Sequence, residues 1–233
     1  MNYTSTFFDG LLHLFFPQTC IGCGNDIIMR DELLCTGCTD NLPLTNFHLY
    51  SGNPLEKVFT GRLRLHAAAA LMYFSKQSVI QHLLHALKYK GNREIGLHLG
   101  RMMGQLLNES PRFQDLFALI PLPLHPSRLK RRGYNQAEVI CTGLAEQLKI
   151  PVISTAVKRI AKTSTQTHKG RMERWENMEG RFAVVDEAVI RHKHVLLVDD
   201  VITTGATLES CGSELLKVPG LQLSIASIAY TSS

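Results

Sequence analysis

Two adjacent carboxylates, Asp199 and Asp200, follow a run of four apolar residues and precede a loop of hydroxyl-bearing and small residues. The apolar run predicts a buried strand, and a helical pattern begins within the loop. A Thr- and Gly-rich turn at a helix start offers unpaired backbone N–H groups, and the positive end of the helix dipole, to a phosphate. The hydroxyls of Thr203, Thr204 and Thr207 add donors. This end of the segment therefore favours phosphate binding.

The two carboxylates suit a different part of the same ligand. They cannot bind phosphate, but they accept hydrogen bonds from a sugar diol or help to hold Mg²⁺. In an open α/β sheet, ligands bind outside the carboxyl ends of the strands, where these acids are expected. A phosphate at one end and a diol at the other describe a ribose 5-phosphate. The plainer interpretation is a buried strand that ends in a solvated turn.

Four of the six cysteines form two C-x-x-C pairs. Paired knuckles of this kind place four thiolates around a tetrahedral Zn²⁺, and Gly22, Gly24 and Gly37 suit the sharp turns. A redox pair or a disulfide framework is the competing interpretation, although thiols stay reduced in the cytosol. All four ligands come from the protein, so the zinc would be structural. The predicted ligands are Cys20, Cys23, Cys35 and Cys38, whereas Cys141 and Cys211 are expected in the core.

Three further segments carry cations that suit an anionic ligand. Residues 121–136 leave a predicted strand through three prolines, which exclude helix there, and then place four cations within five residues. Pyrophosphate or a nucleic-acid backbone would suit this run equally, and a solvated surface is the plainer alternative. The cations are Arg128, Lys130, Arg131 and Arg132.

The other two segments are residues 163–177 and 87–92. The first is polar, hydroxyl-rich and cationic, and its length inside a compact domain predicts a lid or binding loop, with a disordered surface loop as the alternative. Its cations include Lys169, Arg171 and Arg174. The second ends a predicted helix with Lys88, Lys90 and Gly91. Favourable placement of lysine against the helix dipole explains it, and a role in ligand binding stays open.

The composition indicates the kind of protein that positions these residues. The chain has 233 residues, 45% of them hydrophobic and 19% charged, which is typical of a globular protein with a full-sized core. Its formal net charge of +5 is a mild bias towards anionic partners. The apolar stretch 7–16 is too short for a membrane span and lacks the features of a signal peptide. We therefore expect a short helix there and a cytoplasmic protein.

Strand-like and helix-like patterns alternate after a polar connector at residues 51–54. This alternation predicts an α/β fold, a mostly parallel sheet with helices on both faces. We expect a zinc module over residues 1–45 and one larger domain over residues 46–233. The expected strands lie near residues 67–74, 117–122, 152–153, 182–185, 195–198 and 223–230, and the expected helices near residues 79–89, 95–107, 135–148 and 206–217.

Residues 195–207 resemble the phosphoribosyl diphosphate (PRPP) signature of type I phosphoribosyltransferases, in which an acidic pair precedes a T-T-G-A-T loop. The whole chain resembles the ComF/GntX family of competence-associated proteins. This wider resemblance rests on the double C-x-x-C module, the A-L-K-Y-K-G segment at 86–91, the segment at 120–136 and the lid pattern at 166–182. One departure from the family pattern is Lys169-Gly170, where a Leu and a small polar residue are expected.

The resemblance implies a type I phosphoribosyltransferase-like fold with an N-terminal zinc module and a PRPP site. The loop Thr203, Thr204, Gly205, Ala206 and Thr207 would hold the 5-phosphate. Asp199 and Asp200 would hold the ribose hydroxyls and would be the residues on which catalysis depends. Mg²⁺ would arrive with the pyrophosphate. Candidates for contacts with the pyrophosphate are Arg131, Arg132, Lys169, Arg171 and Arg174.

The resemblance also implies a role in natural transformation, with single-stranded DNA and other competence proteins as partners. No segment of the chain identifies a base-recognition element, so two hypotheses stay open. One is a PRPP-binding protein of DNA uptake, whose zinc module and basic loops face nucleic acid or a partner. The other is an active phosphoribosyltransferase that transfers ribose 5-phosphate from PRPP to a base or amine and releases pyrophosphate.

Overall fold

The computed structural model describes residues 19–26, 32–160 and 182–232. Its central sheet has four strands, namely β1 (Ala67–Tyr73), β2 (Ala118–Pro121), β5 (His194–Ile202) and β6 (Gln222–Tyr230). Their order is β1-β6-β5-β2, and every neighbouring pair is parallel. Most residues of these strands are buried, as expected for a parallel sheet with covered faces. The predicted α/β fold with a parallel sheet is confirmed.

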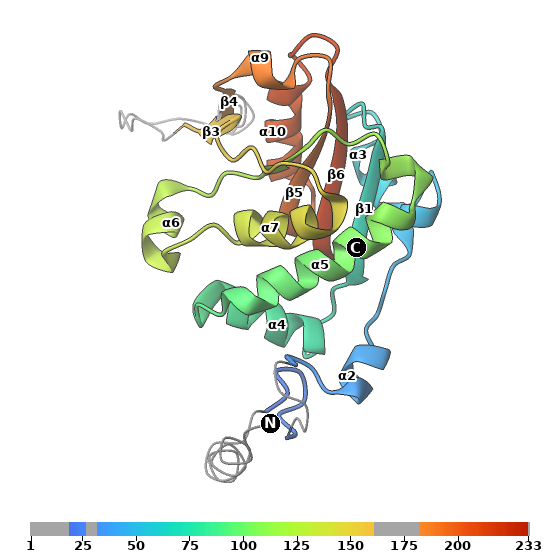
Figure 1. Cartoon of the computed structure of the whole chain (residues 1–233), viewed down its shortest axis with the longest axis vertical. Helices are drawn as coiled ribbons and strands as arrows, with labels where there is room; N and C mark the ends of the chain where they lie inside the picture. Colours follow the sequence, from blue (N-terminus) through green and yellow to red (C-terminus); the bar gives the residue numbers. More distant parts are fainter. Residues whose placement is uncertain (1–18, 27–31, 161–181, 233) are drawn as a thin grey trace, which may run out of the picture.

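Helices flank this sheet (Figure 1). Among the described residues, none of them has the length and apolar character that crossing a bilayer needs. The helices are α2 (Thr36–Asp40), α3 (Pro54–Phe59), α4 (Val79–Tyr89), α5 (Arg93–Glu109), α6 (Pro126–Arg132), α7 (Gln136–Leu148), α9 (Glu187–Ile190) and α10 (Ala206–Leu215), with the 3₁₀ turns η1 (Phe47–Leu49) and η2 (Pro111–Phe113).

The helices α5 and α7 pack closely against each other. A Cβ atom at Gly100 of α5 would lie 2.3 Å from the carbonyl oxygen of Ile140 in α7, so the two backbones cross at a distance that only glycine allows. α7 also packs against β2 and β5. Its first turn lies at the carboxyl ends of these strands, where Gln136 and Ala137 share a cavity with Leu122 and Asp199. The thiols of Cys141 in α7 and Cys211 in α10 are fully buried, which confirms the prediction that both belong to the core.

β5 is longer than the sequence predicts. The expected strand ends at Val198, but β5 continues through Asp199 and Asp200 to Ile202, with β6 paired along this extension. β2 ends at Pro121, opposite Val198, so within the described residues no strand covers that edge of β5 beyond Val198. The two acids therefore lie inside a strand, at the point where its neighbour ends, and not after the strand. Hydrogen bonding to β6 therefore keeps these residues in a strand, although the local sequence favours a turn.

A second, two-stranded antiparallel sheet consists of β3 (Val157–Arg159) and β4 (Phe182–Val184). The sequence predicts β4 but not β3, because two of the three residues of β3 are cations. The strand expected at 152–153 is only a single bridge between Val152 and Leu119. The lid expected at 163–177 and the helix expected at 7–16 lie outside the described residues.

The basic run after β2 forms the short helix α6, which the sequence does not predict. Pro126 occupies the first turn of α6, where a backbone N–H has no acceptor within the helix, so the absence of this group in proline costs no hydrogen bond. Gly133 ends the helix in the left-handed conformation, with φ of 77°. None of the α6 residues is buried, so no apolar stripe reveals this helix in the sequence.

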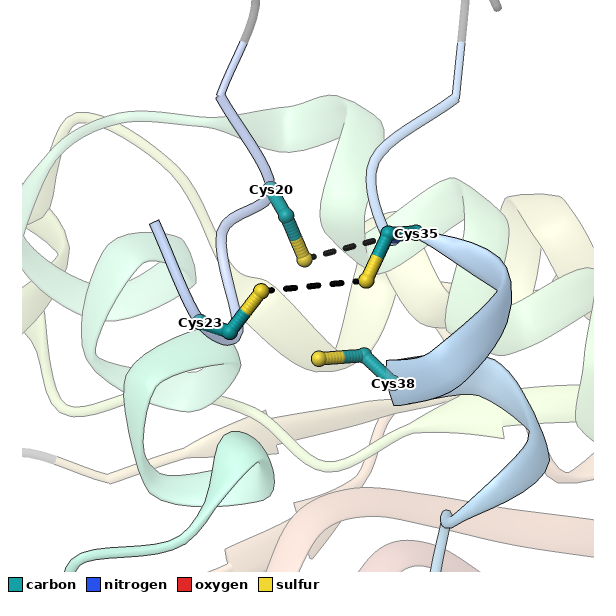
Figure 2. A group of neighbouring side chains, drawn as sticks. All are labelled: Cys20, Cys23, Cys35 and Cys38. Carbon is teal, nitrogen blue, oxygen red and sulfur yellow. Dashed lines mark hydrogen bonds between the residues drawn. The ribbon is translucent and has the colours of Figure 1, made fainter. Parts of the chain in front are cut away.

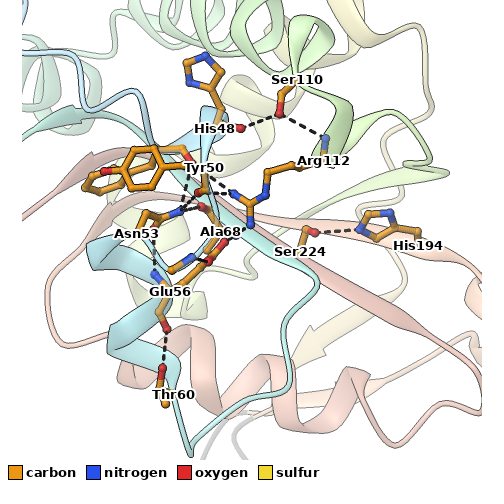
Figure 3. A network of polar contacts seen from close by, with 12 residues as sticks. His48, Tyr50, Asn53, Glu56, Thr60, Ala68, Ser110, Arg112, His194 and Ser224 are labelled. Carbon is orange, nitrogen blue, oxygen red and sulfur yellow. Dashed lines mark hydrogen bonds and ion pairs between the residues drawn. The ribbon is translucent and has the colours of Figure 1, made fainter.

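The segment after the zinc module joins the edge of the sheet. Leu44 forms an antiparallel bridge with Met72 of β1. Asn53 is fully buried, and its Nδ2 donates to the carbonyl oxygens of Phe47 at 3.1 Å and Ala68 at 2.9 Å (Figure 3). Its Oδ1 accepts from an N–H of the first turn of α3. The connector predicted at residues 51–54 is thus a hydrogen-bonded corner between η1, α3 and β1.

Candidate functional site

A cavity of about 570 Å³ opens at the carboxyl ends of β5 and β2. Its charged and hydroxyl-bearing lining comes from α4, α6, β3, β5, the loop after β5, α10 and the residue that follows β6, segments that lie far apart in the sequence. Two acids, three threonines and four cations therefore meet in one space. They are Asp199, Asp200, Thr203, Thr207, Thr231, Lys88, Arg128, Arg132 and Arg159.

The predicted site residues fall into three groups. Five of them, Asp199, Asp200, Thr203, Thr207 and Arg132, line this cavity. Four others do not line it: the exposed Arg131, and the loop residues Thr204, Gly205 and Ala206, which shape the turn between β5 and α10. The remaining three, Lys169, Arg171 and Arg174, lie outside the described residues.

The turn between β5 and α10 is held in one conformation. Gly205 has φ of 72°, in the left-handed region, and a Cβ atom there would lie 2.8 Å from Cε1 of Phe59. Arg62 donates from Nη1 to the carbonyl oxygen of Thr204 at 2.9 Å and pairs with Glu209 in the first turn of α10. With the turn held in this way, Thr207 in the first turn of α10 lines the cavity.

The acidic pair carries less charge than two free carboxylates would. Burial raises the pKa of Asp199, the neighbouring Asp200 charge raises it further, and the resulting value is about 7. Three effects lower the pKa of Asp199. The N–H of Asp200 donates to its Oδ1 at 2.8 Å, and the positive charges of Lys88 and Arg159 favour the ionised carboxylate. At neutral pH Asp199 is therefore partly protonated, so the pair can both donate and accept hydrogen bonds.

Lys88 is the cation in contact with this pair. Its Nζ lies 2.9 Å from Oδ1 of Asp200, and the two side chains are only 20% and 13% exposed. The sequence leaves open whether the segment that contains Lys88 binds a ligand, and it does not show which residue the lysine contacts. That contact depends on how α4 packs beside β5.

Arg128 and Arg159 are further lining cations that the predicted ligand set omits. The basic run of α6 signals Arg128 in the sequence. No comparable signal marks Arg159, because the pairing of β3 with β4 brings it to the cavity and stacks its guanidinium over Phe182 at 5.2 Å.

Arg132 combines two kinds of contact in the cavity wall. Its Nη1 donates to Oε1 of Gln136 at 2.6 Å, and its guanidinium lies over the ring of Tyr89 at 5.5 Å. Its Nε is buried, and no hydrogen-bond partner for it lies within the described part of the chain. A buried donor of this kind is costly without an acceptor, so an anionic ligand here would satisfy it.

The four cysteines of the two knuckles converge on one point (Figure 2). All four Sγ atoms lie within 4.8 Å of one another, and those of Cys23 and Cys35 are 3.7 Å apart. A Zn–S bond of about 2.3 Å in a tetrahedron separates neighbouring sulfurs by about 3.8 Å, so the cluster fits a metal ion. The two knuckles differ, however. Gly24 adopts φ of 76°, whereas Gly37 lies inside α2, so the predicted turn role of Gly37 is wrong.

The thiols of this cluster differ in acidity. Burial raises the pKa of Cys20, but N–H groups of Cys23, Cys35 and Gly22 lower it to about 6. Burial and the neighbouring thiols raise the pKa of Cys38 to about 12. Four thiolates this close repel one another, so full deprotonation requires a cation between them.

A second cavity, of about 650 Å³, lies near the amino ends of β1 and β6. Arg64 and His66 are its only charged or titratable lining residues within the described ranges, and the rest of its wall is mostly aliphatic. It has neither the acidic pair nor the hydroxyls, so we assign the chemistry to the cavity at the carboxyl ends.

Comparison with known proteins places this geometry in a class. The family described as "Phosphoribosyl transferase domain" matches residues 134–232. Adenine phosphoribosyl transferase from Trypanosoma brucei is 13% identical, with a TM-score of 0.39, over 78% of this chain and 82% of that chain. The parallel sheet, the strand-end cavity and the family match define a protein with the phosphoribosyltransferase fold.

The chain belongs to the ComF family. It is 30% identical over 222 residues to Competence protein F of Haemophilus influenzae, which covers 89% of this chain and 94% of that protein. It is also 30% identical over 190 residues to DNA utilization protein YhgH of Escherichia coli (strain K12), over 80% of this chain and 79% of that protein. The expected family is therefore confirmed.

Proposed function

We propose that this protein binds PRPP, with Mg²⁺, in the cavity at the carboxyl ends of β5 and β2, and that it serves the handling of transforming single-stranded DNA in the cytoplasm. The observation that carries the first part is the meeting of two acids, three threonines and four cations in one cavity. Phosphate, diol and pyrophosphate are the three groups that such a lining suits.

The proposed ligand has a defined orientation. The loop 203–207, at the first turn of α10, holds the 5-phosphate, and Asp199 and Asp200 accept hydrogen bonds from the ribose hydroxyls. Arg132 contacts the pyrophosphate, and Arg131, Lys169, Arg171 and Arg174 remain candidates for the same group. Mg²⁺ supplies charge neutralisation on the pyrophosphate when it is bound. Zn²⁺ in the four-cysteine cluster is structural, because all four positions are taken by thiols.

Two units divide this work. We propose a zinc module over residues 1–45 and a phosphoribosyltransferase-like domain over residues 46–233. The module contacts the domain through α4, since Nδ1 of His82 lies 3.1 Å from the carbonyl oxygen of Gly22. The antiparallel bridge between Leu44 and Met72 of β1 forms the second connection.

Calorimetry of PRPP with Mg²⁺ tests the site. Wild type is expected to bind, and Asp200→Asn is expected to bind about tenfold more weakly or worse, because one charged hydrogen-bond acceptor for the sugar is lost. Asp186→Asn is the matched control, because Asp186 is exposed and its side chain does not cap α9. Absence of binding by wild type, or equal binding by Asp200→Asn, would contradict the proposal.

The DNA part rests on family membership together with the cations of α6. The relatives are named for competence and DNA utilization, and Arg128, Lys130 and Arg131 of α6 are all exposed. Cations on a solvent-facing helix suit a phosphate backbone, and such binding weakens as the salt concentration rises, because the release of counterions then contributes less. Single-stranded DNA is therefore the proposed nucleic-acid partner, alongside other competence proteins.

Fluorescence anisotropy with a labelled single-stranded oligonucleotide tests this part. The double variant Lys130→Ala/Arg131→Ala is expected to weaken DNA binding and to flatten its dependence on salt, because two exposed cations of α6 are lost. Arg191→Ala/Lys217→Ala removes two exposed cations elsewhere and is the control. Equal losses of DNA affinity in both double variants would show that only the net charge of the protein matters, and they would refute a DNA-binding surface on α6.

Transferase activity is the second candidate function. It is favoured by the acids and cations that share one cavity, because expulsion of pyrophosphate from C1 needs positioning of the sugar and neutralisation of the leaving group. Pyrophosphate release from PRPP, measured with bases and ammonia as acceptors, is the test. Turnover that disappears in Asp200→Asn supports the enzyme, and PRPP binding without turnover supports a ligand-binding role alone.

A further inference from the structure

We infer that Lys88 binds the pyrophosphate group of PRPP, an inference that rests on the proposed function. Lys88 comes from the last turn of α4, and its Nζ lies 2.9 Å from Oδ1 of Asp200. Both side chains line the cavity, and they are 20% and 13% exposed. The lysine is thus directed into the site and away from bulk solvent.

The stereochemistry of PRPP connects this contact to the leaving group. The pyrophosphate on C1 has the α configuration, so it lies on the same face of the ribose ring as the 2- and 3-hydroxyls. A carboxylate that accepts from these hydroxyls lies on that face. A cation within hydrogen-bond distance of this carboxylate is therefore within reach of the substituent on C1. Among the described cavity residues, Lys88 is the cation in direct ion-pair contact with Asp200.

The fold holds Lys88 in this place independently of Asp200. Leu83, Leu84 and Leu87 bury one face of α4. The hydroxyl of Tyr134 donates to the carbonyl oxygen of Leu87, which fastens the last turn of the helix. The backbone that carries Lys88 is therefore set by packing, and only its flexible side chain needs to move when a ligand arrives.

The ion pair also suits both states of the site. In the empty cavity Lys88 compensates the charge of Asp200, which is otherwise costly to bury. When the ribose hydroxyls donate to Asp200, the ammonium group still has two further N–H donors available for phosphate oxygens. One lysine can thus neutralise the carboxylate and a pyrophosphate oxygen together.

Lys90 provides a matched control. It lies two residues further along, caps the same helix and is exposed. Both lysines are placed favourably against the dipole of α4, so the dipole alone predicts similar behaviour for the two. A contact with pyrophosphate predicts an effect of Lys88 only.

Calorimetry of Lys88→Met and Lys90→Met with three ligands at one Mg²⁺ concentration tests the inference. The ligands are PRPP, inorganic pyrophosphate and ribose 5-phosphate. Lys88→Met is expected to weaken binding of PRPP and pyrophosphate about tenfold or more, because a charged hydrogen bond is lost, and to leave ribose 5-phosphate within about twofold. Lys90→Met is expected to match wild type with all three. Lys88→Arg, which keeps the charge, is expected to retain the preference for PRPP over ribose 5-phosphate.

Three outcomes would overturn the inference, and they separate it from the proposed function. If Lys88→Met binds PRPP as wild type does, the lysine makes no contact with pyrophosphate. If it loses PRPP and ribose 5-phosphate equally, its role is to hold Asp200, and Lys88→Gln, which retains a donor for that acid, should then recover both ligands together. If wild type binds none of the three ligands, the proposed function fails together with the inference.

Discussion

The main-chain N–H of Asp200 donates a hydrogen bond of 2.8 Å to Oδ1 of Asp199. Consecutive residues of a strand direct their side chains to opposite faces, so this bond turns the Asp199 carboxylate back along the backbone. Both carboxylates consequently reach the same cavity from a single strand. The acidic pair thus acts as one coupled unit.

Replacing Asp200 with Asn should lower the pKa of Asp199. The pKa is raised to about 7 by burial and by the Asp200 charge, and the substitution removes the second cause. Carbon-13 NMR titration of the Asp199 carboxyl measures the change. Asp186→Asn is the control, because Asp186 is exposed. An unchanged titration of Asp199 in Asp200→Asn would show that burial alone sets its acidity.

His194 should make the protein sensitive to acid. It is buried, its Nε2 lies 2.8 Å from Oγ of Ser224 (Figure 3), and its Nδ1 has no partner within the described ranges. Burial, together with His66, lowers the pKa of His194 from 6.5 to about 4, while Asp115 opposes this. The unfolded chain therefore binds a proton that the folded protein does not bind. Stability contributed by neutral His194 is present above pH 6.5 and is lost as the pH falls through 4.

Urea unfolding between pH 7 and pH 4 measures this loss, which is at most about 1.4 kcal/mol per pH unit. His194→Gln should flatten the dependence, because glutamine does not titrate. His192→Asn is the control, because His192 is exposed and asparagine tolerates its φ of 56°. The same slope in His194→Gln and wild type would assign the acid sensitivity to other groups.

Gly205→Ala should destabilise the protein more than Gly52→Ala does. Both glycines have positive φ, 72° and 69°, which costs alanine about 1–2 kcal/mol. Only at Gly205 does the new Cβ meet an atom, Cε1 of Phe59 at 2.8 Å, whereas nothing lies within 4 Å of it at Gly52. The extra overpacking cost is about 1–3 kcal/mol, measured by urea unfolding. Equal losses of stability in the two variants would mean that the ring of Phe59 moves aside without an energetic cost.

Removing the proposed Zn²⁺ should loosen the first turns of α4. Gly22 lies between the cysteine cluster and α4. A Cβ atom at this position would be 3.0 Å from Sγ of Cys38 and 2.9 Å from Cγ1 of Val79 in α4. The ring of His82 contacts the carbonyl of the same glycine. Hydrogen exchange before and after chelation should show faster exchange in α4 and unchanged exchange in α7. Unchanged protection of α4 would show that the knuckles fold without influence on the helix.

Strong periodicity made several elements predictable. The helix expected at 79–89 agrees with α4, because five buried apolar residues recur at helical spacing. The short elements were harder. β3 has three residues with two cations, and α6 has no buried residue, so neither carries an apolar pattern. Their existence depends on a partner strand and on a helix start at Pro126.

The types of chemistry in this chain are determined by the sequence itself. Local order alone places two acids before a Thr-Gly loop and four cysteines in two knuckles, because a strand end, a phosphate-binding turn and a metal cluster are each built from neighbouring residues. Which distant residues join them was decided by the tertiary structure. The meeting of Lys88 and Arg159 with Asp200 and Asp199 arises from helix packing and strand pairing over long separations, and no local pattern encodes such contacts.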